Sequence, residues 1–194
     1  MIKAIMLIFE PGSAWDKIVF AQKSFRYVFF LFFLPLILVS IGGEVAGRIY
    51  LAKHPETEVV VRQPPSFLIA YGACEVVLSL AVAFIGAKVV KSVAETFHGR
   101  NTFTQCFTLV AYTLSPLFLV HLLDAYPGMN QWASFGIGMV LSVAALYHGV
   151  PRVLQPDPPH AFGLYLISVL LLSGIAALAR LLSLLVLTGK IKMH

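Results

Sequence analysis

The chain has 194 residues, of which 59% are hydrophobic and only 12% are charged, and its mean hydropathy is +0.86. These values exclude an ordinary water-soluble protein and predict an all-α integral membrane protein that lies in the lipid bilayer. The net charge of +5, from 14 Lys and Arg against 9 Asp and Glu, does not favour nucleic acid as a partner, because membrane proteins use basic residues first for orientation.

The chain begins with MIKAIMLIFEPGSAW, whose apolar stretch ends at Glu10 and Pro11. This stretch is shorter than the apolar core of a secretory signal, which takes about 7–15 residues, so we expect it to be retained. One interpretation is a short interfacial helix over residues 1–9, followed by a second surface helix from about Ser13. Its anchors in the lipid would be Trp15, Ile18, Val19 and Phe25. The alternative is an ordinary water-soluble tail.

Five segments are long and apolar enough to cross the hydrocarbon core of a bilayer, which takes roughly 20 residues of helix. Helices are expected because lipid offers no hydrogen-bond partners to an open backbone. The predicted spans cover about residues 27–43, 66–87, 106–123, 132–147 and 161–188. We therefore predict a five-transmembrane-helix bundle with a short N-terminal interfacial helix, forming a single domain over residues 1–194.

The distribution of basic residues predicts the orientation of this bundle. Five spans place the two ends of the chain on opposite sides, so Lys and Arg can be compared between the sides. The predicted side of the N-terminus carries eight and the other side five, with Arg180 left inside a span. This bias favours a cytoplasmic N-terminus and an external C-terminus.

The chain lacks the usual signatures of soluble enzymes. Cys74 and Cys106 lie in or at the edge of predicted spans, and neither belongs to a CxxC pair, so we expect no disulfide or metal chemistry from them. The sequence has no Walker loop, no dinucleotide-binding glycine pattern, no GxSxG elbow and no HExxH motif. We therefore expect neither an enzymatic activity nor a cofactor.

Glu75 and Arg180 each lie several residues inside a long apolar span. A charge within a membrane is costly unless it is paired or wetted, which makes each of them a functional-site hypothesis. One interpretation is a structural pair across the bundle, or side chains that reach toward the membrane surface. The other is a polar cavity that both residues line.

Two shorter-range pairs lie near the ends of predicted spans. Glu44 and Arg48 are four residues apart, the spacing of an ion pair on one helix, and we expect an interfacial, structural pair. His121 and Asp124 share one helix face near the end of the third span. A hydrogen-bonded histidine is favoured over a metal ligand there, because two groups are too few for a closed metal site.

Prolines interrupt two of the predicted spans. Pro116 cannot donate its N–H and conflicts with the carbonyl of Tyr112, so we expect a kink there. The side chain of Ser115 or Thr113 would donate a hydrogen bond to some of the backbone carbonyl groups that the kink leaves without a partner. Pro35 would act in the same way on the first span, and two facing broken helices would resemble the interrupted helices of transporters. The alternative is that proline is simply common in transmembrane helices.

The fourth span carries small residues at every fourth position, which lets a neighbouring helix approach closely. These residues are Ser134, Gly138 and Ser142, and the expected counterpart on the fifth span is Ser173, Ala177 and Leu181. The row indicates either close packing within one chain or a contact between copies in a homo-oligomer.

Several stretches of the chain resemble one known family. AYTLSPLFL, residues 111–119, resembles the third-span signature of the Yip family, the Ypt/Rab-interacting membrane proteins, in which a small residue and a Tyr are followed four residues later by a Pro. Tyr112 and Pro116 match those positions. The preceding HGRNTFTQCFTLVAY looks like the glycine-rich turn of the family, and LIFEPGSAWDKI is similar to the beginning of its bacterial members.

The link between the fourth and fifth spans extends this likeness. ALYHGVPRVLQPDPPHAFGL, residues 145–164, resembles the link of the family, with Tyr147, Gly149 and Pro151 at matching positions. The resemblance covers nearly the whole chain and is greatest to the small bacterial inner-membrane proteins called YohC-like. His98 and Ala111 stand where the family usually has glycine. The acidic N-terminal region by which eukaryotic members are thought to meet Rab-type GTPases is missing, which argues against a GTPase partner.

The resemblance implies a five-span bundle, a cytoplasmic N-terminus in a bacterial inner membrane, self-association or binding to other membrane proteins, and no established catalytic residues. The leading hypothesis is thus a non-enzymatic organiser of membrane components, which uses the segments 88–100 and 147–160 as a cytoplasmic contact surface. The rival is a small transporter or channel for a lipid, an ion or another small solute. Its path would be lined by Glu75, Arg180, Tyr112 and Pro116. An enzyme is a distant third.

Overall fold

A computed structural model describes residues 2–53, 63–126 and 128–188 of the chain. Every regular element among these residues is a helix, which confirms the predicted all-α class. Five helical segments are long and apolar enough to cross a membrane, as predicted. They are Phe25–Ala52, Pro65–Thr96, Phe103–Ala125, Gln131–Val153 and Pro158–Leu187.

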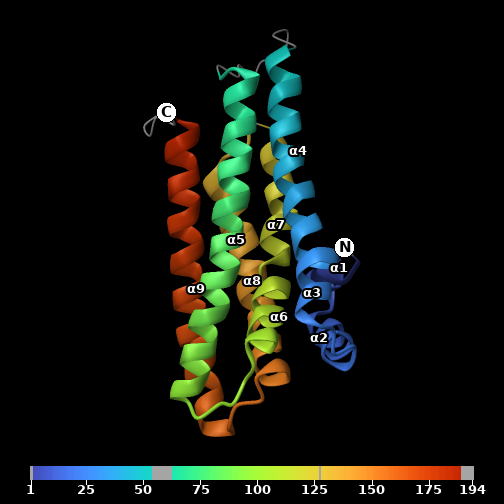
Figure 1. Ribbon diagram of the computed structural model, residues 1–194, viewed down its shortest axis with the longest axis vertical. Helices are drawn as coiled ribbons and strands as arrows, with labels where there is room; N and C mark the ends of the chain where they lie inside the picture. The colour runs from blue at the N-terminus through green and yellow to red at the C-terminus, as the bar shows by residue number, and fades with distance from the viewer. Residues whose placement is uncertain (1, 54–62, 127, 189–194) are drawn as a thin grey trace.

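The two longest of these helices run side by side along the long axis of the molecule (Figure 1). They are α5 (Pro65–Thr96), with 32 residues, and α9 (Pro158–Leu187), with 30. At 1.5 Å per residue each is about 45–48 Å long, which exceeds a hydrocarbon core of about 30 Å. Both helices begin with a proline, whose missing N–H costs nothing in the first turn.

The fourth span, α8 (Gln131–Val153), and the first half of the third, α6 (Phe103–Thr113), begin at capping residues. Asn130 Oδ1 accepts a hydrogen bond from the backbone N–H of Trp132 at 2.9 Å. At α6, Thr102 and Gln105 each accept from the other's backbone N–H, at 3.3 and 2.8 Å. These caps satisfy backbone donors that would otherwise be left over at a helix start.

The third span is broken where the sequence predicts a kink. α6 ends at Thr113 and α7 (Ser115–His121) begins directly after Leu114. Ser115 Oγ donates to the carbonyl oxygen of Tyr112 at 2.7 Å, which satisfies the carbonyl that Pro116 leaves without a donor. Beyond α7, a short 3-10 helix, η2 (Leu122–Ala125), completes the span.

The first span is irregular as well, and it meets the broken third span. It consists of α3 (Phe25–Tyr27), the π-helix η1 (Val28–Phe33) and α4 (Leu34–Lys53), so the wide turns come directly before Pro35. Ser40 Oγ on α4 donates to the carbonyl oxygen of Phe118 on α7 at 2.6 Å. The two irregular spans therefore contact each other at this point.

Two short helices precede the first span, α1 (Ile2–Phe9) and α2 (Pro11–Phe20). They lie against the side of the bundle in Figure 1. The prediction that Trp15 and Ile18 anchor α2 in lipid is wrong, because both side chains are buried. Trp15 Nε1 donates to the carbonyl oxygen of Ala145 on α8 at 2.8 Å. The indole fits there because Gly149 has no side chain: a Cβ at that position would lie 2.7 Å from the indole ring.

Six phenylalanine side chains from the first three spans pack together, and we call them the aromatic cluster. Ring centroids lie 4.8 Å apart for Phe25 and Phe107 and 5.3 Å apart for Phe84 and Phe107. Phe25, predicted as a lipid anchor, is thus packed against other protein side chains. The cluster comprises Phe25, Phe29, Phe33, Phe84, Phe103 and Phe107.

The small residues of the fourth span contact the third span, and the predicted counterpart on the fifth is wrong. A Cβ at Gly138 would lie 2.9 Å from Cα of Leu117, so α8 and α7 approach almost backbone to backbone. On α9, Leu181 is exposed. The reason is the topology: α8 follows the third span after a short turn and packs back on it, whereas α9 packs mainly against α5.

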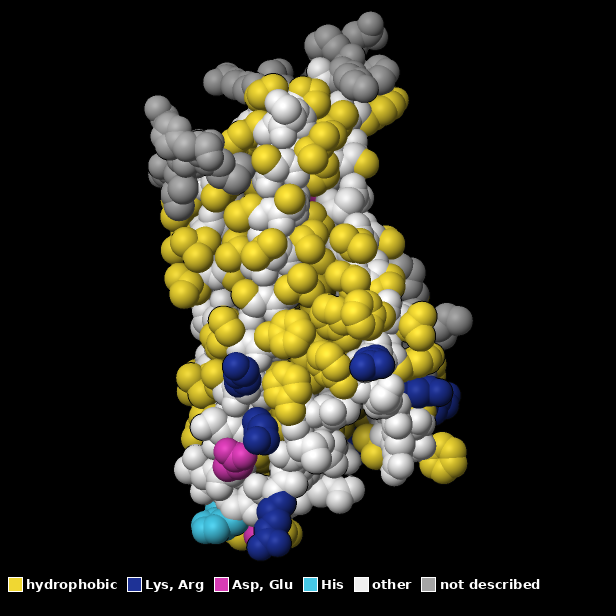
Figure 2. Space-filling view, in the orientation of Figure 1, with side chains coloured by type: hydrophobic (Ala, Val, Ile, Leu, Met, Phe, Trp, Pro, Cys, Tyr) yellow, Lys and Arg dark blue, Asp and Glu magenta, His cyan; other side chains and the backbone are white. Residues whose placement is uncertain are grey.

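The contact surface predicted for the two basic segments is mostly helical. α5 extends to Thr96, so Lys88 and Lys91 lie in its last turns, with Lys91 Nζ 3.1 Å from Glu95 Oε1. α8 extends to Val153 and α9 begins at Pro158, which leaves residues 154–157 as the link. The Lys and Arg side chains of the face shown in Figure 2 gather in the lower part of the view, below a broad apolar band.

Candidate functional site

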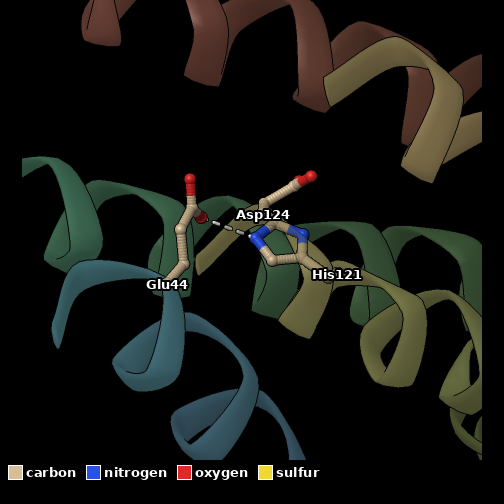
Figure 3. Close-up of side chains that lie close together, drawn as sticks. All are labelled: Glu44, His121 and Asp124. Atoms are coloured by element: carbon tan, nitrogen blue, oxygen red, sulfur yellow. Dashed lines mark hydrogen bonds and ion pairs between the residues drawn. The ribbon is translucent and has the colours of Figure 1, made fainter. Parts of the chain in front are cut away.

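Glu44 on α4 meets His121 and Asp124 of the third span through a close approach of two backbones. A Cβ at Gly43 would lie 2.9 Å from Leu122 Cδ2, and one at Gly47 would clash with the carbonyl of Ala125. These two glycines, four residues apart, let η2 lie directly on α4. The imidazole Nε2 of His121 consequently lies 2.7 Å from Glu44 Oε2, with Asp124 beside them (Figure 3).

Glu44 is fully buried and has further polar partners. Arg48 Nε donates to Glu44 Oε1 at 2.9 Å, and the hydroxyl of Tyr71 on α5 donates to the same oxygen at 3.3 Å. The predicted pair of Glu44 and Arg48 is confirmed, and Glu44 is buried within the protein. Glu44 is 0% exposed, because η2 and α5 cover it.

Arg180 on α9 joins two carboxylates from other spans. Its Nη1 donates to Glu75 Oε1 on α5 at 3.0 Å, and its Nη2 donates to Asp124 Oδ2 on η2. Glu75 and Arg180 are each 5% exposed. The sequence predicted that these two residues could pair across the bundle, and this is confirmed. The sequence did not indicate that Asp124 also accepts a hydrogen bond from Arg180.

Three hydroxyl or amide side chains also contact these carboxylates. Ser134 Oγ on α8 donates to Asp124 Oδ1 at 2.5 Å, and Ser183 Oγ on α9 donates to Glu75 Oε1 at 3.0 Å. Gln131 Nε2 lies 3.5 Å from Glu44 Oε1. Such partners reduce the cost of burying charge, because they replace hydrogen bonds to water.

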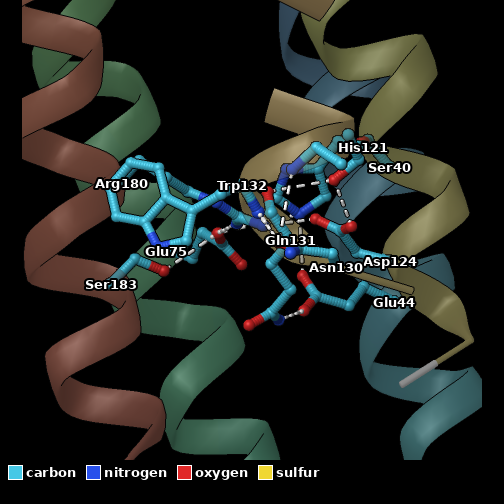
Figure 4. A network of polar contacts seen from close by, with 12 residues as sticks. Ser40, Glu44, Glu75, His121, Asp124, Asn130, Gln131, Trp132, Arg180 and Ser183 are labelled. Atoms are coloured by element: carbon cyan, nitrogen blue, oxygen red, sulfur yellow. Dashed lines mark hydrogen bonds and ion pairs between the residues drawn. The ribbon is translucent and has the colours of Figure 1, made fainter. Parts of the chain in front are cut away.

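Together these side chains form a polar cluster to which each of the five spans contributes (Figure 4). It comprises Glu44, Arg48, Tyr71, Glu75, His121, Asp124, Gln131, Ser134, Arg180 and Ser183. Glu75 lies ten residues after the start of α5 at Pro65, or about 15 Å along the helix at 1.5 Å per residue. The cluster therefore lies within the five candidate membrane-spanning segments, with Asp124 at the end of the third and Gln131 at the start of the fourth.

A cavity of about 50 Å³ adjoins the polar cluster. Its polar end is formed by Glu75, His121, Asp124 and Arg180, and its walls by apolar side chains of α5, α7, α8 and α9. Glu75 Oε2 is buried and has no hydrogen-bond partner among the described residues. A space of this size with polar groups at one end holds a few water molecules or a small cation.

The remaining residues that the sequence singled out lie elsewhere. Tyr112 stacks on Phe32 with ring centroids 4.0 Å apart and meets Trp15 edge-on at 6.1 Å. Tyr112 and Pro116 are not among the residues that line the cavity. Tyr147 is exposed and packs against Tyr165 with ring centroids 5.3 Å apart, and Pro151 lies in the last turn of α8.

Sequence reasoning missed several members of the polar cluster. Tyr71, Ser183 and Gln131 were not predicted, and nothing in a single sequence separates such residues from ordinary helix polar residues. Gly43 and Gly47 did carry a signal, since two glycines four residues apart on a span indicate close helix contact. Their position on either side of Glu44 could have predicted that another span covers it.

The chain matches the Yip1 domain family over residues 5–181. The match covers more than half of the chain and includes every member of the polar cluster except Ser183. No curated protein and no solved structure matches the chain.

Proposed function

The chain belongs to the Yip1 domain family of membrane proteins, and on this premise we propose that it is a non-enzymatic protein that binds and organises other membrane components. The match confirms the family that the third-span signature resembles. The bacterial YohC-like branch, the inner membrane as location and the cytoplasmic N-terminus stay part of the proposal. The observation that carries the proposal is the location of the exposed cationic side chains.

Apart from Lys3 and Lys53, whose side chains the structure does not describe, the Lys and Arg residues of the described segments fall into two sets. Arg48 and Arg180 are buried in the polar cluster. The others with described side chains lie near the end of the bundle where α5 and α8 finish, and we call this region the basic end. They are Lys17, Lys23, Arg26, Lys88, Lys91, Arg100 and Arg152.

Exposed aromatic side chains accompany these cations. Phe20 at the end of α2 is 90% exposed, and Phe162 near the start of α9 is 69% exposed. A surface that combines Lys and Arg with aromatic rings fits the cytoplasmic membrane interface and the contact with partner proteins there. Inside the bundle, by contrast, the two guanidinium groups of the polar cluster are paired with its carboxylates and are buried within the chain.

Photocrosslinking in intact membranes tests this proposal. We would place a photoreactive benzoylphenylalanine at position 88 or 162 and, as a matched control, at position 140, because Val140 is 70% exposed in the middle of α8. The proposal expects discrete protein adducts from positions 88 and 162 that position 140 does not give. Identical adducts from all three positions, or none from 88 and 162, would contradict it.

A small carrier or channel is the second candidate, and the cavity beside Glu75 favours it. Its polar end contains a carboxylate oxygen without a described hydrogen-bond partner, and the interrupted third span forms part of its wall. Tyr112 does not line this cavity, so a path would have to pass along Glu75 and Arg180 alone.

Thiol labelling separates the two candidates. Glu75→Cys would be made in a chain lacking Cys74 and Cys106, and treated in intact membranes with a small membrane-impermeant reagent. A matched control is Ala83→Cys, two turns further along the same helix at a fully buried apolar position. Labelling at position 75 but not at 83 would favour the carrier. No labelling at 75 in folded protein would favour the organiser.

A further inference from the structure

The polar cluster contains a set of metal-ligand groups that no single span could supply. One nitrogen or oxygen atom from each of Glu44, His121 and Asp124 lies within 4.8 Å of the others. Glu75 approaches the same place, since its Oε1 lies 3.6 Å from His121 Nε2. The four groups come from α4, α5, α7 and η2. The sequence alone offered only His121 and Asp124, which are too few.

We propose that Glu44, Glu75, His121 and Asp124 form a binding site for one divalent transition-metal cation. An imidazole nitrogen combined with carboxylate oxygens is a ligand set suited to ions such as Zn²⁺. Ligand atoms around a tetrahedral Zn²⁺, bound at about 2.0–2.2 Å, are about 3.3–3.6 Å from one another. The distance of 3.6 Å from His121 Nε2 to Glu75 Oε1 lies at the upper end of this range, whereas the 2.7 Å to Glu44 Oε2 is a hydrogen bond that would lengthen on metal binding.

Charge supports a cation at this place. The polar cluster holds three carboxylates, Glu44, Glu75 and Asp124, but only two guanidinium groups, Arg48 and Arg180. When His121 is neutral, one negative charge within the cluster therefore has no permanent counter-charge. An unbalanced charge is costly in a low-dielectric interior, so the cluster favours the uptake of positive charge.

An independent observation points to a ligand. Glu75 is 5% exposed and its Oε2 has no hydrogen-bond partner among the described residues, while the residue lines the cavity together with His121 and Asp124. Buried carboxylate oxygens rarely stay without a partner. A metal ion next to this oxygen would satisfy it without any new protein donor.

The neighbouring polar groups would act as an outer shell that orients the ligands. Ser134 and Arg180 donate to Asp124, and Arg48 and Tyr71 donate to Glu44. Ligating carboxylates in metal sites are commonly hydrogen-bonded in this manner, and these partners contribute to affinity. Each carboxylate oxygen retains a further lone pair for the metal. The site is independent of the proposed function, because it concerns the interior rather than the basic end.

Zn²⁺ binding to the purified full-length chain tests the site. The protein would be made without a polyhistidine tag, reconstituted in lipid nanodiscs, stripped with a chelator and titrated with Zn²⁺, with Mg²⁺ as the comparison ion. We expect one equivalent of Zn²⁺, a higher melting temperature in Zn²⁺, and little response to Mg²⁺, which prefers all-oxygen sites with bound water.

Two variants and one control locate the bound ion. His121→Ala and Glu44→Gln should each bind Zn²⁺ at least tenfold more weakly, on the scale of lost metal-site partners. Glu44→Gln keeps the shape of the side chain, so its Zn²⁺ affinity tests the site even if His121→Ala does not fold. The control is His160→Ala at the basic end, whose imidazole lies near His98 with ring centroids 6.2 Å apart. Zn²⁺ binding lost in His160→Ala but kept in Glu44→Gln, or absent from the parent protein, would overturn the proposal.

Discussion

The half of the bundle near the basic end is filled by the aromatic cluster, whereas the other half is filled by the polar cluster. Phe107 and its neighbours contact one another through apolar ring surfaces, with centroids about 5–6 Å apart as aromatic pairs prefer. In the other half, Arg180 is hydrogen-bonded to Glu75 and Asp124 on two other spans. The first half depends on the shape of its side chains, and the second depends on ion pairs and hydrogen bonds.

The two halves of the bundle are stabilised by different interactions. Lipid tails are as apolar as phenylalanine, so the aromatic cluster gains from close fit rather than from leaving water. Ion pairs and hydrogen bonds are directional, and an unpaired partner inside the membrane is costly. We therefore expect the polar half to be sensitive to the loss of a single group, and the aromatic half to be sensitive to added volume.

The largest effect is expected for Arg180→Leu. The substitution leaves Glu75 and Asp124 buried without their shared cation and should lower the free energy of unfolding by about 3–5 kcal/mol, the range for breaking one side of a buried ion pair. The measurement is equilibrium unfolding in mixed micelles. The control is Arg152→Leu, because Arg152 is partly exposed and pairs with the exposed Asp16, and surface pairs contribute about 0–1 kcal/mol. Equal losses in both variants would remove the distinction between the buried cluster and the surface.

A smaller effect is expected in the aromatic half for Gly149→Ala. Its new Cβ would lie 2.6 Å from Leu109 Cδ1 and 2.7 Å from the indole of Trp15, and overpacking of this kind costs about 1–3 kcal/mol. Gly136→Ala is the matched control on the same helix, since no atom lies within 4 Å of a Cβ placed there. It should be neutral or slightly stabilising, as alanine favours helix. A loss in Gly136→Ala as large as in Gly149→Ala would show that helix α8 is sensitive for another reason.

The smallest loss of stability is expected from replacing a serine whose hydroxyl is hydrogen-bonded, compared with a serine whose hydroxyl has no described partner. Ser134→Ala removes the hydrogen bond to Asp124 and should cost about 0.6–1.7 kcal/mol, the range for hydrogen bonds between membrane helices. Ser142, two turns further along α8, is also buried, but its hydroxyl has no hydrogen-bond partner among the described residues. Ser142→Ala should therefore leave the unfolding midpoint in the same assay nearly unchanged. The reverse order of the two variants would contradict the assignment of Ser134 to the polar cluster.

Sequence by itself determined the class and the family of this protein. The length and apolar composition of five segments predicted five helical spans, because a backbone in lipid must form all its hydrogen bonds internally. The break at Pro116 followed from the chemistry of proline, and the spacing around Tyr112 and Pro116 predicted the family. The pairing of Glu75 with Arg180 could also be predicted, since a charge inside the membrane needs a partner.

Only the tertiary structure decided which spans meet and where the polar residues gather. Asp124 is hydrogen-bonded to Arg180, 56 residues away in the sequence, and Glu44 is hydrogen-bonded to His121, 77 residues away. The close contact of η2 with α4 depends on the missing side chains of Gly43 and Gly47. The indole of Trp15 is buried because Gly149 leaves space for it. Local patterns specify what a helix exposes along its length. The neighbour that covers each face depends on packing between segments far apart in the chain, which no local pattern records.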